Sequence, residues 1–273
     1  MVPLYRGRDK YGNLESLDEL KSVLSDMYAR SPSFLDTDLH GIKFDIGNLA
    51  HTLVEAQCNS IPKVFDYIFS ANAKGEGKAR WGDKTPYYVF HINTLLEMFP
   101  DAQFIHIIRD GRDCALSMED RKKDFRIFNY YMSGKYWQSF VDSGNRAAKG
   151  LSSDVITEIQ YEELLSEPEK VVANLCEFLG EEYSESVIDF KKSGEAGKTP
   201  LLQKPIQANN SNKWRDRMTQ RNIRLFEAAA AETLDNNGYS VETSPEPLPK
   251  LLEVIYRIHD ATMQKLPRKL TQT

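Results

Sequence analysis

The stretch that decides the fold is WGDKTPYYVFHINTLLEMFPDAQFIHIIRDGRDCALSM, residues 81–118. Within it, residues 103–108 are short, apolar and rich in β-branched side chains, as expected of a strand buried in a parallel sheet. Residues 109–113, RDGRD, are predicted to form a turn, and residues 114–121 a helix. A strand, a turn and a helix in this order indicate parallel α/β architecture.

Arg109 follows the predicted strand directly. Its guanidinium should therefore emerge at the carboxyl edge of the sheet, where open α/β sheets bind ligands. The next helix directs its N–H groups and its positive dipole end toward the same place. Ser117, about two turns into that helix, can present a hydroxyl along it. A guanidinium, a helix start and a hydroxyl together predict an anion site, most naturally for a phosphate.

The size, composition and net charge of the chain limit the fold class and the kinds of partner that we expect. The chain has 273 residues, with 41% hydrophobic and 27% charged residues, which predicts a single globular α/β domain over residues 1–273. The 35 basic and 40 acidic residues give a net charge of −5. A nucleic-acid partner is not expected at that charge, whereas a local basic pocket for a small anion is compatible with it.

Cysteine and histidine usage predicts neither disulfides nor a metal site. Cys58, Cys114 and Cys176 lie far apart among apolar neighbours and are predicted to be buried free thiols, which suggests a reducing compartment. The five histidines share no metal-ligand spacing, and His106 is predicted to be a satisfied core residue on the strand. The chain starts without a signal-like apolar stretch and contains no apolar run long enough to span a bilayer. A cytoplasmic location is the expectation.

The rest of the chain reads mainly as helices. A second strand is predicted at 154–161 and a polar loop at 190–213. Helices are predicted at 18–29, 45–57, 61–73, 87–99, 130–149, 168–179, 219–236 and 248–266.

Four motifs in order resemble the sulfotransferases that use 3′-phosphoadenosine-5′-phosphosulfate (PAPS). Arg109 and Ser117 match the Arg and Ser, separated by seven intervening residues, that bind the 3′-phosphate of the cosubstrate in that family. The sequence GDKTP at 82–86 resembles the family's lysine motif. YEELL at 161–165 with EFLG at 177–180, and Trp214 with NNGY at 236–239, resemble its later parts.

The resemblance implies a fold and a reaction. The fold is a central parallel sheet flanked by helices, the P-loop nucleotide-kinase-like sulfotransferase fold. The reaction moves a sulfuryl group from PAPS to an acceptor hydroxyl, on a carbohydrate or a small molecule, and releases adenosine 3′,5′-bisphosphate (PAP) without a metal. Gln207, Ala208 and Asn209 stand where cytosolic small-molecule members have Arg-Lys-Gly, which favours the bacterial or carbohydrate branch. The oligomeric state is not predicted.

The resemblance also assigns roles, each with a structural alternative. Lys84 matches the lysine near the transferred group, or it is a solvated lysine. Asp83 matches an acid that serves as general base in some members, or it forms a salt bridge or cap. Tyr161 lies near the nucleotide, or it packs in the core. Arg109 with Asp110 has the alternative of a strand-end ion pair.

One part of the family pattern is not found in these residues. In the family, an N-terminal strand and a Gly/Ser/Thr loop wrap the 5′-phosphosulfate with backbone N–H groups. Residues 1–5, MVPLY, resemble the part that follows that stretch. We therefore expect the N-terminal strand and phosphosulfate loop to be missing. An alternative function is a truncated, inactive PAP-binding or scaffold protein.

Overall fold

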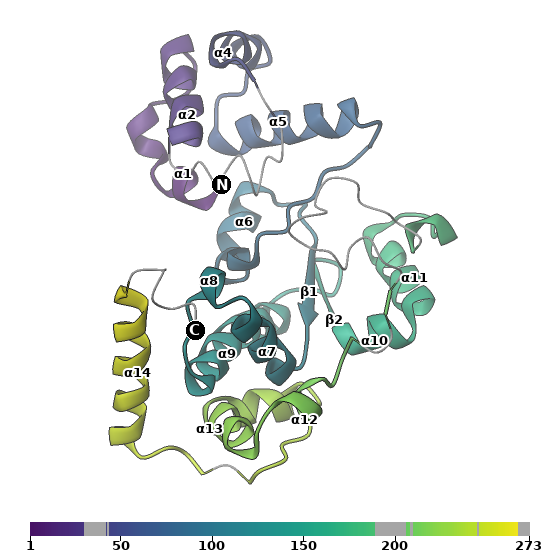
Figure 1. Cartoon of the computed structure of the whole chain (residues 1–273). Coiled ribbons are helices and arrows are strands. Elements are labelled where there is room, and N and C mark those ends of the chain that lie inside the picture. The colour runs from purple at the N-terminus through teal and green to yellow at the C-terminus, as the bar shows by residue number, and fades with distance from the viewer. Residues whose placement is uncertain (30–41, 43, 189–205, 208–209, 245, 267–273) are drawn as a thin grey trace. The chain divides into compact units, whose positions relative to one another are not determined.

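A computed structural model describes residues 1–29, 42, 44–188, 206–207, 210–244 and 246–266 (Figure 1). The chain groups into two compact units, Met1–Ala102 and Gln103–Thr273. The single domain predicted over residues 1–273 stays a prediction. Most of the polar loop predicted at 190–213 lies outside the described residues.

The first unit is helical. Its elements are α1 (Val2–Arg6), η1 (Arg8–Tyr11), α2 (Leu17–Ala29), α4 (Ile46–Glu55), α5 (Ile61–Gly75), η2 (Pro86–His91) and α6 (Ile92–Met98). Helices α4 and α5 begin at polar caps, because the side chains of Asp45 and Ser60 accept from backbone N–H groups of the first turn. Leu20, Val23 and Leu24 of α2 are fully buried, as their spacing predicted.

The helix predicted at 87–99 is split into two elements. Residues Pro86–His91 form the 3₁₀ helix η2, in which no side chain is buried. The α-helix begins only at Ile92, where Ile92, Leu95 and Met98 bury their side chains. Tertiary packing therefore sets the start of α6, and the sequence pattern did not locate it.

The second unit contains a two-stranded parallel sheet. Its elements are β1 (Phe104–Ile108), α7 (Gly111–Asp120), α8 (Lys122–Phe125), α9 (Tyr130–Gly150), β2 (Ile156–Gln160), α10 (Tyr161–Ser166), α11 (Pro168–Leu179), η3 (Glu185–Val187), α12 (Trp214–Arg217), α13 (Gln220–Asn236) and α14 (Lys250–Lys265). The register places Ile108 beside Gln160. Because both strands end at that pair, the next residues, Arg109 and Tyr161, emerge at the same edge of the sheet.

Helix α9 lies close against one face of β1. Cross-strand neighbours His106 and Glu158 approach to 2.8 Å between Nδ1 and Oε1, so the predicted satisfied histidine has a partner. Gly144 of α9 faces the His106 ring, and a Cβ at this position would lie 2.0 Å from it. Glycine is therefore the residue that permits this approach.

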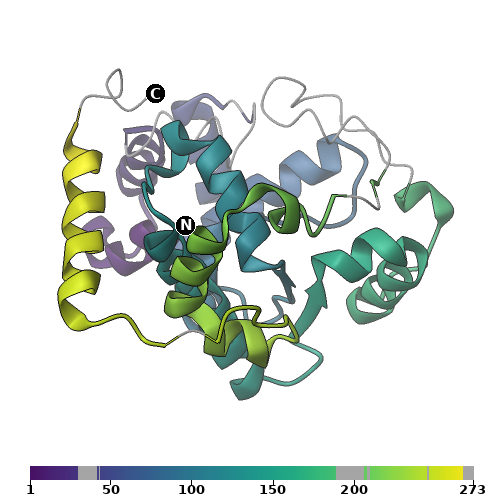
Figure 2. The same cartoon turned by 60° about the horizontal axis from the view of Figure 1, so that its bottom comes forward.

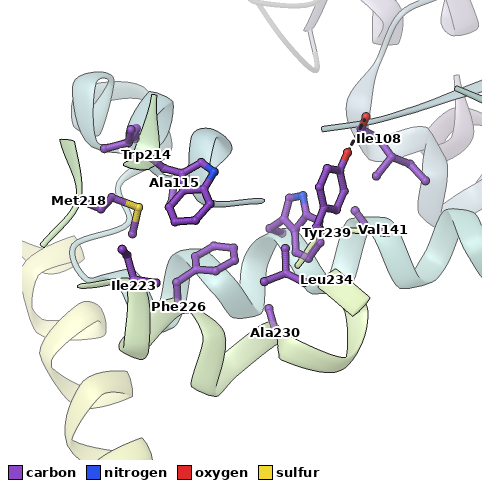
Figure 3. Close-up of a cluster of buried hydrophobic side chains, with 12 residues drawn as sticks. Ile108, Ala115, Val141, Trp214, Met218, Ile223, Phe226, Ala230, Leu234 and Tyr239 are labelled. Carbon is purple, nitrogen blue, oxygen red and sulfur yellow. Dashed lines mark hydrogen bonds between the residues drawn. The ribbon is translucent and has the colours of Figure 1, made fainter. Parts of the chain in front are cut away.

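A hydrophobic cluster supports the carboxyl end of β1 (Figure 3). Its labelled members are Ile108, Ala115, Val141, Trp214, Met218, Ile223, Phe226, Ala230, Leu234 and Tyr239. The Tyr239 hydroxyl donates to the carbonyl of Ile108 at 3.4 Å, and the Trp137 indole donates to the carbonyl of Arg109 at 3.0 Å. Large core side chains thus hold the backbone from which Arg109 projects. None of the helices in the described part of the chain combines the length and apolar character needed to cross a bilayer.

Candidate functional site

The turn after β1 is tighter than predicted. Helix α7 begins at Gly111, three residues before the predicted start at Cys114, because Asp110 caps it by accepting from the backbone N–H of Arg112 at 2.9 Å. A Cβ on Gly111 would lie 2.5 Å from the rings of Phe226 and Trp137. This position requires glycine, and it brings the helix start directly to the strand end.

A buried ion network fixes this helix start. Arg112 donates to both carboxylate oxygens of Asp110, at 3.0 and 2.8 Å, and to Glu227 of α13 at 2.9 Å. The Arg112 guanidinium also lies 3.6 Å from the centre of the Trp214 ring. Asp110 therefore pairs with Arg112, and the alternative of an Arg109–Asp110 ion pair is wrong.

Arg109 is held beside α7, and one of its buried donors is unused among the described residues. Its Nη2 donates to the carbonyl of Asn210 at 3.0 Å and lies 3.7 Å from the Asp113 carboxylate. Its guanidinium lies 4.7 Å from the centre of the Tyr161 ring. The Arg109 Nε–H is shielded and has no hydrogen-bond partner among the described residues. A buried donor without a partner costs about 1–3 kcal/mol, so a ligand oxygen at Nε would be favoured.

Ser117 lies on the same side of α7 as the Arg109 side chain. Asp113, which Arg109 approaches, and Ser117 are four residues apart on one helix and so share a face. Ser117 is half-buried, and its hydroxyl has no hydrogen-bond partner within the described part of the chain. The other carboxylate oxygen of Asp113 accepts from the backbone N–H of Trp214 at 3.0 Å, which fixes the orientation of this carboxylate. The Arg109 guanidinium and the Ser117 hydroxyl can therefore bind an anion together.

Asn210 connects Tyr161 to Arg109 by hydrogen bonds, and no sequence pattern predicted this role. Asn210 donates from its side chain to the Tyr161 hydroxyl at 2.7 Å, while its carbonyl accepts from Arg109. The Lys213 amine in turn donates to the Asn210 side-chain oxygen at 2.6 Å. Asn210 directly follows the segment 207–209, of which residues 208 and 209 lie outside the described residues. Core packing alone does not describe Tyr161, since its ring and hydroxyl both have polar partners.

Glu162 is a second residue missed by the sequence. It accepts from the backbone N–H of Asp110 at 3.0 Å and from the Tyr239 hydroxyl at 2.8 Å. Burial, followed by the nearby Glu162 carboxylate, raises the pKa of Tyr239 far above its usual value, so the phenol stays a donor. Glu162 thereby ties the end of β2 to the turn that carries Arg109. The sequence feature that could have identified Glu162 is its position directly after Tyr161.

Lys84 and Asp83 belong to the first unit. Lys84 is exposed, and the Asp83 carboxylate accepts from the Thr85 hydroxyl at 2.7 Å, a bond between two side chains that does not cap a helix. Hydrogen bonding to Thr85 leaves room for a second role of the carboxylate, because an ionised carboxylate accepts several bonds. The catalytic roles of Lys84 and Asp83 stay predictions.

The thiols are structural in character. Cys58, Cys114 and Cys176 are free, and Cys58 and Cys176 are buried. Burial raises the pKa of the half-buried Cys114 to about 12, so its thiol stays protonated and unreactive at neutral pH. In the residues that the structure describes, no group of three His, Cys, Asp or Glu side chains could hold a metal ion.

Comparison with known proteins decides the family. The profile of the Sulfotransferase family matches residues 13–185, more than half of the chain. The chain belongs to the sulfotransferase family. Its fold agrees with the sulfotransferase domain from the Synechococcus PCC 7002 olefin synthase, with a TM-score of 0.50, 21% identity, and coverage of 82% of this chain and 79% of that domain. The predicted sulfotransferase fold with a parallel sheet is thus confirmed.

Two curated relatives of this chain are named as sulfotransferases with different acceptors. Protein-tyrosine sulfotransferase 1 of Danio rerio is 26% identical over 207 residues, which cover 68% of this chain and 56% of the relative. Omega-hydroxy-beta-dihydromenaquinone-9 sulfotransferase Stf3 of Mycobacterium bovis is 31% identical over 107 residues, which cover 36% of this chain and 28% of the relative. The chain therefore spans about half the length of these relatives, or less.

Proposed function

We propose that this sulfotransferase uses PAPS, and that Arg109 and Ser117 hold the 3′-phosphate of the nucleotide. The observation that carries the proposal is the Arg109 side chain, fixed by Asn210 and Asp113 while its Nε–H has no partner among the described residues. A phosphate oxygen at that donor would satisfy it, and the Ser117 hydroxyl on the same helix face supplies a second contact. Tyr161, already stacked near Arg109, would line the nucleotide.

The proposed reaction is an in-line transfer. The acceptor oxygen forms a bond to sulfur, while the bond between sulfur and the 5′-phosphate oxygen breaks and its electron pair leaves with PAP. The acceptor proton passes to a base, for which we propose Asp83. Negative charge develops on the departing oxygen and on the sulfuryl oxygens, and we propose that Lys84 stabilises it. No metal is needed for these roles.

We propose that the acceptor is a hydroxyl of a carbohydrate or a small molecule. We also propose that the protein acts in the cytoplasm. The relative named a protein-tyrosine sulfotransferase brings in a competing acceptor, the phenol of a tyrosine. Both acceptors present an O–H group to the same chemistry. Sulfate transfer from labelled PAPS to a panel of sugars, phenols and tyrosine peptides separates them.

Binding calorimetry tests the phosphate assignment. We expect PAP to bind at least about tenfold more tightly than 5′-AMP, which lacks the 3′-phosphate. Arg109→Ala should remove about 1.5–3 kcal/mol of PAP binding and leave 5′-AMP binding nearly unchanged. Arg146→Ala, at an exposed arginine of α9, is the matched control and should bind PAP as the parent does. If Arg109→Ala lost the same affinity for 5′-AMP as for PAP, Arg109 would not be a 3′-phosphate ligand.

A second candidate is a protein that binds PAP without transferring sulfate. The 3′-phosphate residues discussed above do not by themselves hold the transferred group, so binding and turnover are separable properties. Tight PAP binding with no labelled product on any acceptor of the panel would support this candidate.

A further inference from the structure

The 3₁₀ helix η2 (Pro86–His91) carries two pairs of ring side chains that point in different directions. A 3₁₀ helix has three residues per turn, so residues three apart lie one above the other on the same side. Tyr87 and Phe90 form one such pair, and Tyr88 and His91 form the other, rotated from the first by about a third of a turn. In Figures 1 and 2 this helix belongs to the blue part of the chain that leads from α5 to α6.

Tyr88 and His91 attach η2 to the N-terminal residues of the first unit. The Met1 amine donates to the Tyr88 hydroxyl at 3.2 Å, and the Arg6 guanidinium lies 3.3 Å from Nδ1 of His91. Both Tyr88 and His91 are half-buried. Burial, followed by the nearby Arg6 charge, lowers the pKa of His91, so its ring is neutral at neutral pH and accepts from Arg6. These contacts fix the rotation of η2 about its own axis.

Tyr87 and Phe90 lie on another side of η2 and are exposed. Their exposed fractions are 59% and 39%, and their ring centres are 6.4 Å apart with the ring planes at 40°. A single exposed apolar side chain is ordinary, whereas two neighbouring exposed rings form an apolar surface of the kind that marks contact sites. Aromatic side chains are also frequent in the lining of small-molecule sites.

The start of η2 carries the residues proposed for the reaction. Thr85 directly precedes η2, and its hydroxyl donates to the Asp83 carboxylate at 2.7 Å. With a rise of about 2 Å per residue, the Tyr87 backbone lies about 4 Å along the helix axis from that of Thr85, which is less than one turn. An acceptor whose hydroxyl lies at the Asp83 carboxylate therefore has its remaining atoms close to Tyr87.

We propose that Tyr87 and Phe90 bind the acceptor and select acceptors whose hydroxyl is carried on a six-membered ring. The two aromatic side chains would pack against the apolar face of the acceptor ring and remove that face from water. A pyranose and a phenol share this chemistry. An alcohol on a flexible chain has no such face and loses more torsional freedom when it binds. The inference rests on the proposed function, because the proposed roles of Asp83 and Lys84 place the reacting hydroxyl at this end of η2.

Acceptor kinetics with the full chain test the proposal. The acceptors are methyl glucopyranoside and N-acetyltyrosine amide, which carry rings, and butanol, which does not. Tyr87→Ala combined with Phe90→Ala should raise the KM of the ring acceptors at least about fivefold. The KM of PAPS and the turnover number should change little, because these side chains bind neither PAPS nor the transferred group, and the KM of butanol should change less than that of the ring acceptors. Unchanged KM values for both ring acceptors overturn the proposal.

Matched variants separate ring contact from a structural effect. Tyr183→Ala removes a ring of the second unit that is 39% exposed, as Phe90 is, and should leave all KM values unchanged. Tyr87→Phe combined with Phe90→Tyr keeps both rings and should restore the KM of the parent. Unchanged thermal unfolding of all variants shows that they fold. An equal rise in KM for Tyr183→Ala and for the double alanine variant contradicts the proposal.

Binding measured without turnover separates this inference from the proposed function. Saturation-transfer NMR of the two ring acceptors should show binding that is lost in the double alanine variant and kept in Tyr183→Ala. Binding of only one ring acceptor would identify the source as the sugar or the phenol, and binding of neither overturns the proposal. Sulfate transfer with unchanged ring binding in the double alanine variant refutes the role of Tyr87 and Phe90 alone. Ring binding that depends on them, without sulfate transfer from labelled PAPS, refutes the proposed function alone.

Discussion

Removal of the Asn210 side chain should weaken PAP binding although Asn210 was not recognised in the sequence. Its amide donates to the Tyr161 hydroxyl at 2.7 Å, and its carbonyl accepts from Arg109 at 3.0 Å. Asn210→Ala keeps the carbonyl and deletes the amide, which removes the bond to Tyr161 together with the exposed contact from Lys213. Such a bond between neutral groups contributes about 0.5–1.5 kcal/mol, which corresponds to a roughly two- to tenfold weaker PAP affinity.

A double-mutant cycle measured by calorimetry makes this prediction specific. Tyr161→Phe deletes the same hydrogen bond from its other end, so each single variant should lose about the same binding energy. The double variant should lose little more than either alone, which gives a coupling energy of about 0.5–1.5 kcal/mol. Lys213→Ala removes an exposed contact to the Asn210 side chain and should change affinity by less than either variant. Additive losses in the cycle would refute the view that Asn210 acts through Tyr161.

Three further predictions concern catalysis, stability and pH. Lys84→Ala should lower sulfate-transfer turnover and leave PAP affinity nearly unchanged, because PAP has no sulfuryl group; equal losses would make Lys84 a general binding residue. Arg112→Met should lower the free energy of unfolding in urea by about 3–5 kcal/mol, because it leaves two buried carboxylates without their partner, whereas a loss below about 1 kcal/mol would contradict that role. Burial raises the pKa of Asp260, so the folded protein binds this proton more tightly and its contribution to stability falls as pH rises through that raised pKa. Asp260→Asn should flatten the dependence of thermal unfolding on pH in the range above the usual titration of an aspartate, and an unchanged profile would count against it.

The sequence predicted the elements that depend on local pattern. The strand at 103–108 and the following helix appear as β1 and α7, and Arg109 emerges at the strand end as expected. The parallel register then brings Tyr161 to the same edge, which the order of strand, helix and strand implied. These features follow from alternation, β-branching and caps, which act over a few residues.

The partners of the site depend on contacts between distant parts of the chain. Arg112 pairs with Glu227, which is 115 residues away, and no pattern near Arg112 indicates it. Asn210 contacts Arg109 across 101 residues from a polar stretch with few apolar residues. Gly111 looked like a turn glycine, whereas its main constraint is the approach of Phe226 and Trp137. Such features are set by tertiary packing, which a single sequence does not display.

A crystal structure of the complex with PAP would show which side chains bind the 3′-phosphate. We expect the 3′-phosphate to accept hydrogen bonds from the Arg109 guanidinium and the Ser117 hydroxyl, with Tyr161 beside the nucleotide. The proposed phosphate site would be wrong if the 3′-phosphate bound away from both residues and the Arg109 guanidinium contacted only Asn210 and Asp113.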